Sequence, residues 1–186
     1  TYTFKEYHTL AGYVLNKEPI TIEHTTDGNV DIIVDNTEQK KFEVVKIDSQ
    51  TKQPLAGVQF KIWRDATLLG DYTTDENGKI TIEKAPAGTY KVQEVATLKE
   101  YILNDKPLEI EHTTDKDTSI TVENTKKPGL SITKIDAETK KPLSGAVFKL
   151  TRANGDVIRE DITTGEDGTA FVEGLDAADY IVTEIT

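Results

Sequence analysis

Residues 42–48 read FEVVKID, and apolar side chains occupy alternate positions until Lys46 interrupts the series. Alternation with a period of two is typical of a β-strand with one buried face. Residues 130–136 read LSITKID and repeat this pattern, with Lys134 in the fifth position. The two stretches therefore belong to copies of one unit, and each places a charged residue where the pattern predicts a core residue.

Other segments recur with nearly constant spacing. TYTFKE at 1–6 returns as TYKVQE at 89–94 and DYIVTE at 179–184, and IEHTTD at 22–27 returns at 110–115. Glu6 and Glu94 lie 88 residues apart, and Glu94 and Glu184 lie 90 apart. A period this long, filled with short strands, indicates whole domains in series and not a solenoid.

We divide the chain accordingly. Residues 1–40 form the C-terminal half of a repeat, 41–127 a complete repeat, and 128–186 the N-terminal two-thirds of a further repeat. The stretches 38–41 (EQKK) and 126–129 (KKPG) are expected linkers.

Composition excludes several classes of function. The chain has no cysteine, which removes disulfides, thiolate catalysis and zinc–thiolate sites. Its formal net charge of -11 argues against partners such as nucleic acid or an anionic membrane surface. No apolar run approaches a membrane span, and the N-terminal residues lack the basic and then apolar stretch of a signal peptide, so a secretion signal is expected outside this segment. A small cysteine-free β domain still needs a staple of another kind.

The complete repeat reads as all-β. We predict strands around alternating residues and no helix longer than a turn or two, which favours tandem Greek-key-like β-sandwiches. The inward-facing sets are Phe42, Val44 and Lys46; Val58, Phe60 and Ile62; Ile80 and Ile82; Tyr90, Val92 and Glu94; Leu108 and Ile110; and Ile120, Val122 and Asn124.

Three polar residues break this inward stripe: Lys46, Glu94 and Asn124. Each break recurs in a neighbouring copy, at Lys134 and Glu184 on one side and at Glu6 and Asn36 on the other. Since a buried lysine or glutamate without a partner is very unfavourable, the three side chains are expected to meet.

Two interpretations of this meeting stay open on the residues alone. One is a buried ion pair with an asparagine hydrogen-bonded beside it, or strand ends that reach water. The other is chemistry: burial favours the neutral forms of an amine and a carboxyl group, a neutral amine is a nucleophile, and a carboxylic acid can polarise an amide. Held in contact, the amine could then attack the asparagine amide and expel ammonia.

Several motifs in order resemble a CnaB-type (SpaA-like, prealbumin-like) domain of Gram-positive surface adhesins and pilins. They are VKID at 45–48, KQPLAGVQF at 52–60, DENG at 75–78, GTYKVQE at 88–94, Tyr101, and VEN at 122–124. The resemblance covers the whole chain, as one full copy and two partial copies. One departure lies in the loop 96–100 (ATLKE), where the family often has proline and glycine before the tyrosine.

The resemblance implies an isopeptide bond between Lys46 and Asn124, with Glu94 as the catalytic proton shuttle. In the partial copies, Lys134 with Glu184 lacks an asparagine, expected beyond residue 186. Glu6 with Asn36 lacks a lysine, expected before residue 1. The alternative is completion between chains, with Lys134 of one molecule joined to Asn36 of the next.

The expected function is a stalk or pilin shaft on the surface of a Gram-positive bacterium, attached to the cell wall by an anchor outside this segment. The alternatives are an adhesin module that binds a host ligand and a segment that polymerises head to tail. Expected partners are neighbouring repeats, identical chains in the polymerising case, and a host matrix protein bound through another part of the parent. We expect no turnover enzyme, because the only chemistry is self-directed, and no cofactor or metal.

Three further signals are given structural interpretations. His24 with Asp27 and His112 with Asp115 lack metal-ligand spacing and are assigned to solvated turns. Residues 75–78 (DENG) have no EF-hand spacing and are assigned to a hairpin turn. Trp63 is expected to point outward, with packing between domains as its use.

Overall fold

The computed structural model describes residues 1–25 and 28–185, and within these residues it is all-β, as predicted. None of the described residues belongs to a helix that is long and apolar enough to cross a membrane. The strands are β1 (Tyr2–Phe4), β2 (Ile20–Ile22), β3 (Phe42–Asp48), β4 (Gln59–Arg64), β5 (Thr67–Thr73), β6 (Lys79–Ile82), β7 (Gly88–Ala96), β8 (Leu108–His112), β9 (Thr118–Asn124), β10 (Leu130–Thr133), β11 (Val147–Arg152), β12 (Val157–Thr163), β13 (Thr169–Val172) and β14 (Tyr180–Glu184).

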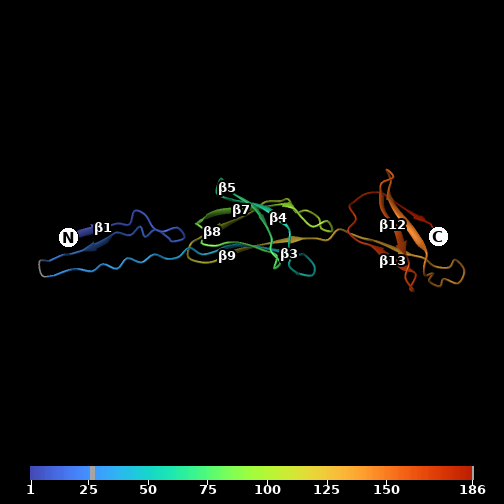
Figure 1. Ribbon diagram of the computed structural model, residues 1–186, viewed down its shortest axis with the longest axis horizontal. Coiled ribbons are helices and arrows are strands. Elements are labelled where there is room, and N and C mark those ends of the chain that lie inside the picture. Colours follow the sequence, from blue (N-terminus) through green and yellow to red (C-terminus); the bar gives the residue numbers. More distant parts are fainter. Residues whose placement is uncertain (26–27, 186) are drawn as a thin grey trace. The chain divides into compact units, whose positions relative to one another are not determined.

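The complete repeat contains two sheets, which Figure 1 shows in the cyan to yellow part of the chain. One sheet has the order β6-β3-β9 and the other β5-β4-β7-β8. The first strand, β3, runs parallel to the last strand, β9, with Phe42 opposite Thr118 and Asp48 opposite Asn124. The two ends of the repeat are therefore neighbours in one sheet, although they are far apart in sequence.

The core lies between these sheets and follows most of the predicted stripe, although Leu108, expected to face inward, is exposed. Phe42, Val44, Phe60, Ile62 and Tyr90 are completely buried. The rings of Phe42 and Tyr90 stack with centroids 4.2 Å apart, which joins the two sheets. Burying each large apolar side chain contributes about 1.5–3 kcal/mol, so the core fixes the register in which β3, β7 and β9 approach each other.

The third copy repeats the first five strands of this arrangement. Strands β10 and β13 form one sheet, and β12-β11-β14 form the other. Its smaller core is built from Phe148, Leu150, Ile162, Val172 and Leu175. Among the described residues it has no counterpart of β8 or β9, so the edge of β10 that corresponds to the β9 side of β3 is unpaired.

In the first copy, β1 and β2 pair as the counterparts of β7 and β8. Residues 30–36 correspond to β9 but form no strand. In the complete repeat the corresponding segment pairs with β3 in parallel. Among the described residues 1–25 and 28–40, the strands are β1 and β2, which pair with each other.

The structure consists of two compact units, one of residues 1–97 and 103–124 and the other of residues 98–102 and 125–186. The loop that carries Tyr101 thus belongs to the same unit as the third copy. Its backbone pairs with the expected linker through a bridge between Tyr101 and Lys126, and Tyr101 is 5% exposed.

Some details differ from the sequence interpretation. The assignment of residues 75–78 to a hairpin turn is wrong, because this turn connects β5 to β6, which lie in different sheets and do not pair. Strand β5 is not among the predicted strands, because all of its residues are partly or fully exposed and its pairing with β4 has a register shift at Ile62–Trp63. The assignment of His112 to a solvated turn is wrong. This residue ends β8 and is buried, with its ring edge-on to those of Phe42 and Tyr90.

Candidate functional site

The strand pairing of the complete repeat brings Lys46, Glu94 and Asn124 together. Lys46 lies on β3 opposite Val122 of β9, two residues before Asn124. Glu94 lies on β7, in the facing sheet, opposite Phe60 of β4. The three side chains thus meet across the interior of the sandwich, which the alternation of β3, β7 and β9 predicts.

All three residues are almost fully enclosed, with 0% exposure for Lys46 and 1% for Glu94 and Asn124. The Lys46 Nζ atom lies 3.7 Å from Glu94 Oε2 and donates a hydrogen bond of 3.2 Å to the carbonyl oxygen of Val122. Asn124 Nδ2 donates to Glu94 Oε1 at 2.6 Å. Glu94 therefore contacts both the amine and the amide.

The site is not fully satisfied by hydrogen bonds. Within the described part of the chain, Glu94 Oε2 and Asn124 Oδ1 are buried without a hydrogen-bond partner. Unpaired buried polar atoms cost about 1–3 kcal/mol each, and such sites call for an explanation. One explanation is that the three side chains are arranged for a reaction, in which the hydrogen bonds of these atoms are completed only as the reaction proceeds.

Burial lowers the pKa of the Lys46 amine below its ordinary value, although the Glu94 carboxylate opposes the shift by stabilising the ammonium form. The neutral amine is the nucleophilic form, so removal from water moves Lys46 towards reactivity.

The sequence analysis missed a fourth member of the site, Thr97. Its Oγ1 atom accepts a second hydrogen bond from Asn124 Nδ2, at 2.8 Å. Together, Glu94 and Thr97 fix the orientation of the asparagine amide. The available signal was repetition, because Thr9 stands three residues after Glu6 just as Thr97 follows Glu94.

The two partial sites hold their predicted residues in open surroundings. Lys134 Nζ lies 2.7 Å from Glu184 Oε2, but the side chains are 31% and 41% exposed. In the complete repeat, β9 contributes the asparagine and Val122 to the environment of the lysine, and the third copy has no described equivalent. The Lys134–Glu184 contact is therefore an ordinary solvated ion pair.

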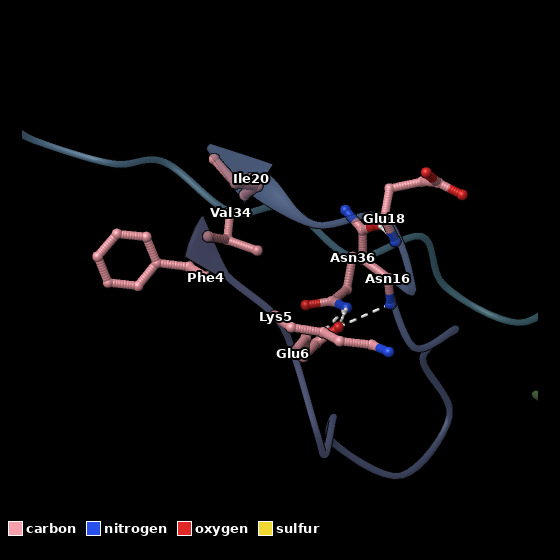
Figure 2. Close-up of a pocket in the computed structure, with 8 residues that line it drawn as sticks. All are labelled: Phe4, Lys5, Glu6, Asn16, Glu18, Ile20, Val34 and Asn36. Atoms are coloured by element: carbon pink, nitrogen blue, oxygen red, sulfur yellow. Dashed lines mark hydrogen bonds between the residues drawn. The ribbon is translucent and has the colours of Figure 1, made fainter. Parts of the chain in front are cut away.

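In the first copy, Asn36 Nδ2 donates to both carboxylate oxygens of Glu6, at 3.0 and 2.8 Å, and to the carbonyl oxygen of Val14. The backbone amide of Asn16 also donates to Glu6. Figure 2 shows Glu6, Asn16 and Asn36 close together, and all three line a groove of about 320 Å³. These hydrogen bonds hold the pKa of Glu6 below its ordinary value, the Asn36 bond most strongly.

The buried histidine and the single tryptophan take part in internal contacts. His112 Nε2 bonds to the carbonyl oxygen of Ala85 at 3.1 Å, and Nδ1 bonds to the Thr118 hydroxyl at 2.9 Å. Because a carbonyl only accepts, Nε2 carries the proton. The Lys91 ammonium lies 4.4 Å from the ring centroid of Trp63, from the neighbouring strand.

No group of three or more histidine, aspartate or glutamate side chains suited to a metal ion occurs in the parts of the chain that the structure describes. Asp27, paired with His24 in the sequence interpretation, lies outside the described residues.

A β-sandwich whose first and last strands are parallel neighbours, with lysine, glutamate and asparagine enclosed between its sheets, defines the class of protein. The model of the SpaA prealbumin-like fold domain family matches residues 40–126 and again residues 128–186. The chain therefore belongs to this family of Gram-positive adhesin and pilin domains, and the resemblance recognised in the sequence is confirmed.

Individual relatives agree with the family. A collagen adhesin of Staphylococcus aureus is 28% identical over 172 residues, a match that takes in 82% of this chain and 14% of the adhesin. Among solved structures, the TIE protein of Bacillus anthracis has a TM-score of 0.52 at 22% identity, over 99% of this chain and 39% of that protein. The shaft pilin SpaA of Lactobacillus rhamnosus GG has a TM-score of 0.52 at 16% identity, over 78% and 87% of the two chains.

The chain thus spans about one-seventh of the curated relative that it matches. The structural matches support the prealbumin-like fold.

Proposed function

We propose that this chain is part of the stalk of a Gram-positive surface adhesin or pilin, and that its complete repeat is locked by a Lys46–Asn124 isopeptide bond. The observation that carries the proposal is the enclosed contact of Lys46, Glu94 and Asn124 between the first and last strands. The family and its adhesin and pilin relatives support the setting.

The proposed reaction starts from a neutral Lys46 amine and a protonated Glu94. Lys46 Nζ attacks Cγ of Asn124 while the Glu94 proton passes to the amide, and the carboxylate then takes a proton from Nζ. The bond from Cγ to Nδ2 of Asn124 then breaks, and Nδ2 leaves as ammonia. Glu94 gives and regains one proton, so the net change is one new amide and the loss of one ammonia.

Three features of the site favour this step. Enclosure between the sheets supplies the high effective concentration of an intramolecular reaction. Burial lowers the pKa of the Lys46 amine. The hydrogen bonds to Glu94 and Thr97 hold the departing nitrogen of Asn124 beside a group that can protonate it. The reaction occurs once per repeat, so the protein is not a turnover enzyme.

The mechanical consequence follows from the strand order. Because β3 is the first strand and β9 the last, a covalent bond between them carries tension from one end of the repeat to the other without shearing the sheet. The bond contains no sulfur and is insensitive to reductants. It would serve as the staple that this cysteine-free domain otherwise lacks.

Intact mass tests the proposal. The purified chain should lack the mass of one ammonia, whereas Lys46→Ala and Glu94→Ala variants should have their full sequence masses. A parent protein of full mass, recovered folded, would refute the reaction and leave a buried polar cluster.

A second candidate is head-to-tail linkage between chains. Its support is the complementary content of the partial sites, since Lys134 with Glu184 offers the amine and Asn36 with Glu6 offers the amide. A ladder of covalent multimers on a denaturing gel, abolished by Lys134→Ala, would establish it. A single band would exclude it.

A binding role is the third candidate, because one relative is named a collagen adhesin. Saturable nanomolar binding of this chain to collagen or another matrix protein would establish that role. The absence of such binding would leave the stalk function.

A further inference from the structure

Both expected linkers are held by contacts of the same design, which we call clasps. In the first clasp, Tyr13 pairs with Glu38, and the amide of Ala85, just after β6, donates to the carbonyl oxygen of Lys40 at 2.8 Å. In the second, Tyr101 pairs with Lys126, and the amide of Leu175, just after β13, donates to the carbonyl oxygen of Pro128 at 2.9 Å. Each clasp fastens the loop of one repeat to the end of the repeat before it.

The two clasps have the same pattern of backbone contacts, but the charges of their ion pairs are distributed in opposite ways. In the first clasp the linker contributes the acid and the loop the base of an ion pair, since Lys84 Nζ lies 2.8 Å from Glu38 Oε1. In the second the linker is basic and the loop acidic, since Lys127 Nζ lies 2.7 Å from Asp176 Oδ1. The Asp176 carboxylate also accepts a hydrogen bond from Arg152 at 2.9 Å.

Side-chain size is exchanged in the same way. Lys84 packs on Gly12, where an added Cβ would overlap the lysine side chain. In the second clasp the residue equivalent to Lys84 is Gly174, and the residue equivalent to Gly12 is Glu100. A Cβ added to Gly174 would meet Glu100 at 3.5 Å. Each clasp thus pairs one glycine with one long side chain, in opposite order.

The backbone of Lys84 gives an independent reason to assign it a role. Its φ of 50° lies in the left-handed region, and Gly174 has a φ of 71° at the equivalent position. A lysine rarely adopts this conformation, whereas glycine adopts it freely. Strain of this kind persists where surrounding contacts demand it. The ammonium of Lys84 makes two such contacts, with Glu38 and with the Tyr13 ring at 5.5 Å.

We propose that the loop after β6 or β13 is a docking surface for the C-terminal end of the preceding repeat, and that its charge and size select which repeat can precede it. The loop with Lys84 fits an end that carries glycine and an acid. The loop with Gly174 and Asp176 fits an end that carries a larger residue and a lysine. A mismatched order would bring like charges or two long side chains together, so specificity includes a repulsive part.

Amide hydrogen exchange in the full chain tests the proposal, because each clasp has its own reporter. The Ala85 amide reports the first clasp and the Leu175 amide the second. Glu38→Lys or Lys84→Glu should speed exchange at Ala85 about two- to fivefold, the range measured for exposed ion pairs, and should leave Leu175 unchanged. The double variant, with the charges exchanged, should restore the Ala85 rate.

Lys84→Gly separates docking from backbone strain. It removes the ion pair but relieves the left-handed φ, so exchange at Ala85 should rise while the unfolding midpoint of the repeat stays level or rises. Slower exchange at Ala85 in this variant would overturn the role given to the lysine.

Selectivity is tested by transferring the acidic loop. Lys84→Gly with Pro86→Asp copies the loop of the second clasp onto the complete repeat, and the introduced carboxylate then lies at the position of Asp176, with Gln39 in place of its partner Lys127. Exchange at Ala85 should become faster, and adding Gln39→Lys, which copies Lys127, should slow it again. An Ala85 amide that exchanges at a free-peptide rate in the parent, or a failure of either compensating change, would overturn the proposal.

Discussion

Replacing Glu94 by glutamine tests the central claim with the smallest change in shape. The variant keeps the volume of the side chain and removes its ability to relay a proton. The parent should lack one ammonia and Glu94→Gln should have its full mass. The stability difference follows from the loop that the bond closes. Lys46 and Asn124 lie 78 residues apart, and closing a loop of this size removes unfolded-state entropy worth about 4–5 kcal/mol.

The single tryptophan makes this difference measurable for one repeat. Trp63 lies on β4, so its fluorescence follows unfolding of the complete repeat. With guanidinium slopes typical of small domains, a loss of that size lowers the midpoint by about 1–2 M. In Glu94→Gln, Lys46 is also buried beside a neutral amide instead of a carboxylate, which lowers the unfolding midpoint further.

Glu184→Gln is the matched control. It makes the same replacement where the side chains are 31% and 41% exposed, and exposed pairs contribute about 0–1 kcal/mol. It should change neither the ammonia deficit nor the Trp63 midpoint. The proposed role of Glu94 is refuted if Glu94→Gln also lacks one ammonia, or if it has full mass and unfolds at the midpoint of the parent.

Three further predictions use the same assays. Thr97→Val, which removes one acceptor of the Asn124 amide, should slow ammonia loss after refolding about fivefold, and Thr97→Ser should not, since one hydrogen bond is worth about 1 kcal/mol. Because burial lowers the pKa of Lys46, ammonia loss should accelerate as the pH rises towards that lowered pKa and level off before the ordinary lysine value of about 10.4. His112→Phe leaves the Ala85 carbonyl and the Thr118 hydroxyl unpaired, so unfolding should become easier by about 1–3 kcal/mol with no change in the ammonia deficit.

The sequence predicted the part of the site that depends on strand alternation. Lys46, Glu94 and Asn124 each continue a period-two stripe of core residues, and each stripe faces the same interior. A polar residue in such a stripe can be satisfied only by another, so three interruptions predict one cluster. The all-β fold follows from the same pattern and is confirmed.

The features that the pattern missed lie where alternation ends. Thr97 follows the last residue of β7, and its contact depends on the path of the loop, where this chain departs from its family. His112 ends β8 beside a turn, so its neighbours in sequence are polar, while the rings that bury it come from β3 and β7. Local sequence does not encode such contacts between distant strands.

The linkers show the same limit in another form. Residues 38–41 (EQKK) and 126–129 (KKPG) are rich in charged residues, and the second stretch also contains proline and glycine, but composition says nothing of what they contact. Glu38 and Lys127 acquire partners only because a loop later in the chain, at Lys84 and at Asp176, returns to the start of the repeat. The opposite signs become visible once the ion pairs of the two clasps are compared, because the acid comes from the linker in the first clasp and from the loop in the second.

The contrast between two lysines of the same motif shows what the chemistry requires. Lys46 and Lys134 both lie beside a glutamate, yet Lys46 is completely enclosed and the Lys134 side chain is 31% exposed. What differs is β9, which lies beside β3 and brings Asn124 and the Val122 carbonyl to the lysine. The same strand, β9, therefore helps to enclose Lys46, which lowers the pKa of its amine, and carries the amide that this amine would attack. Since β9 is the last strand of the repeat to be synthesised, the proposed bond can form only after the whole repeat has folded. The cross-link would then fix the native pairing of β3 with β9 and could not trap an incomplete fold.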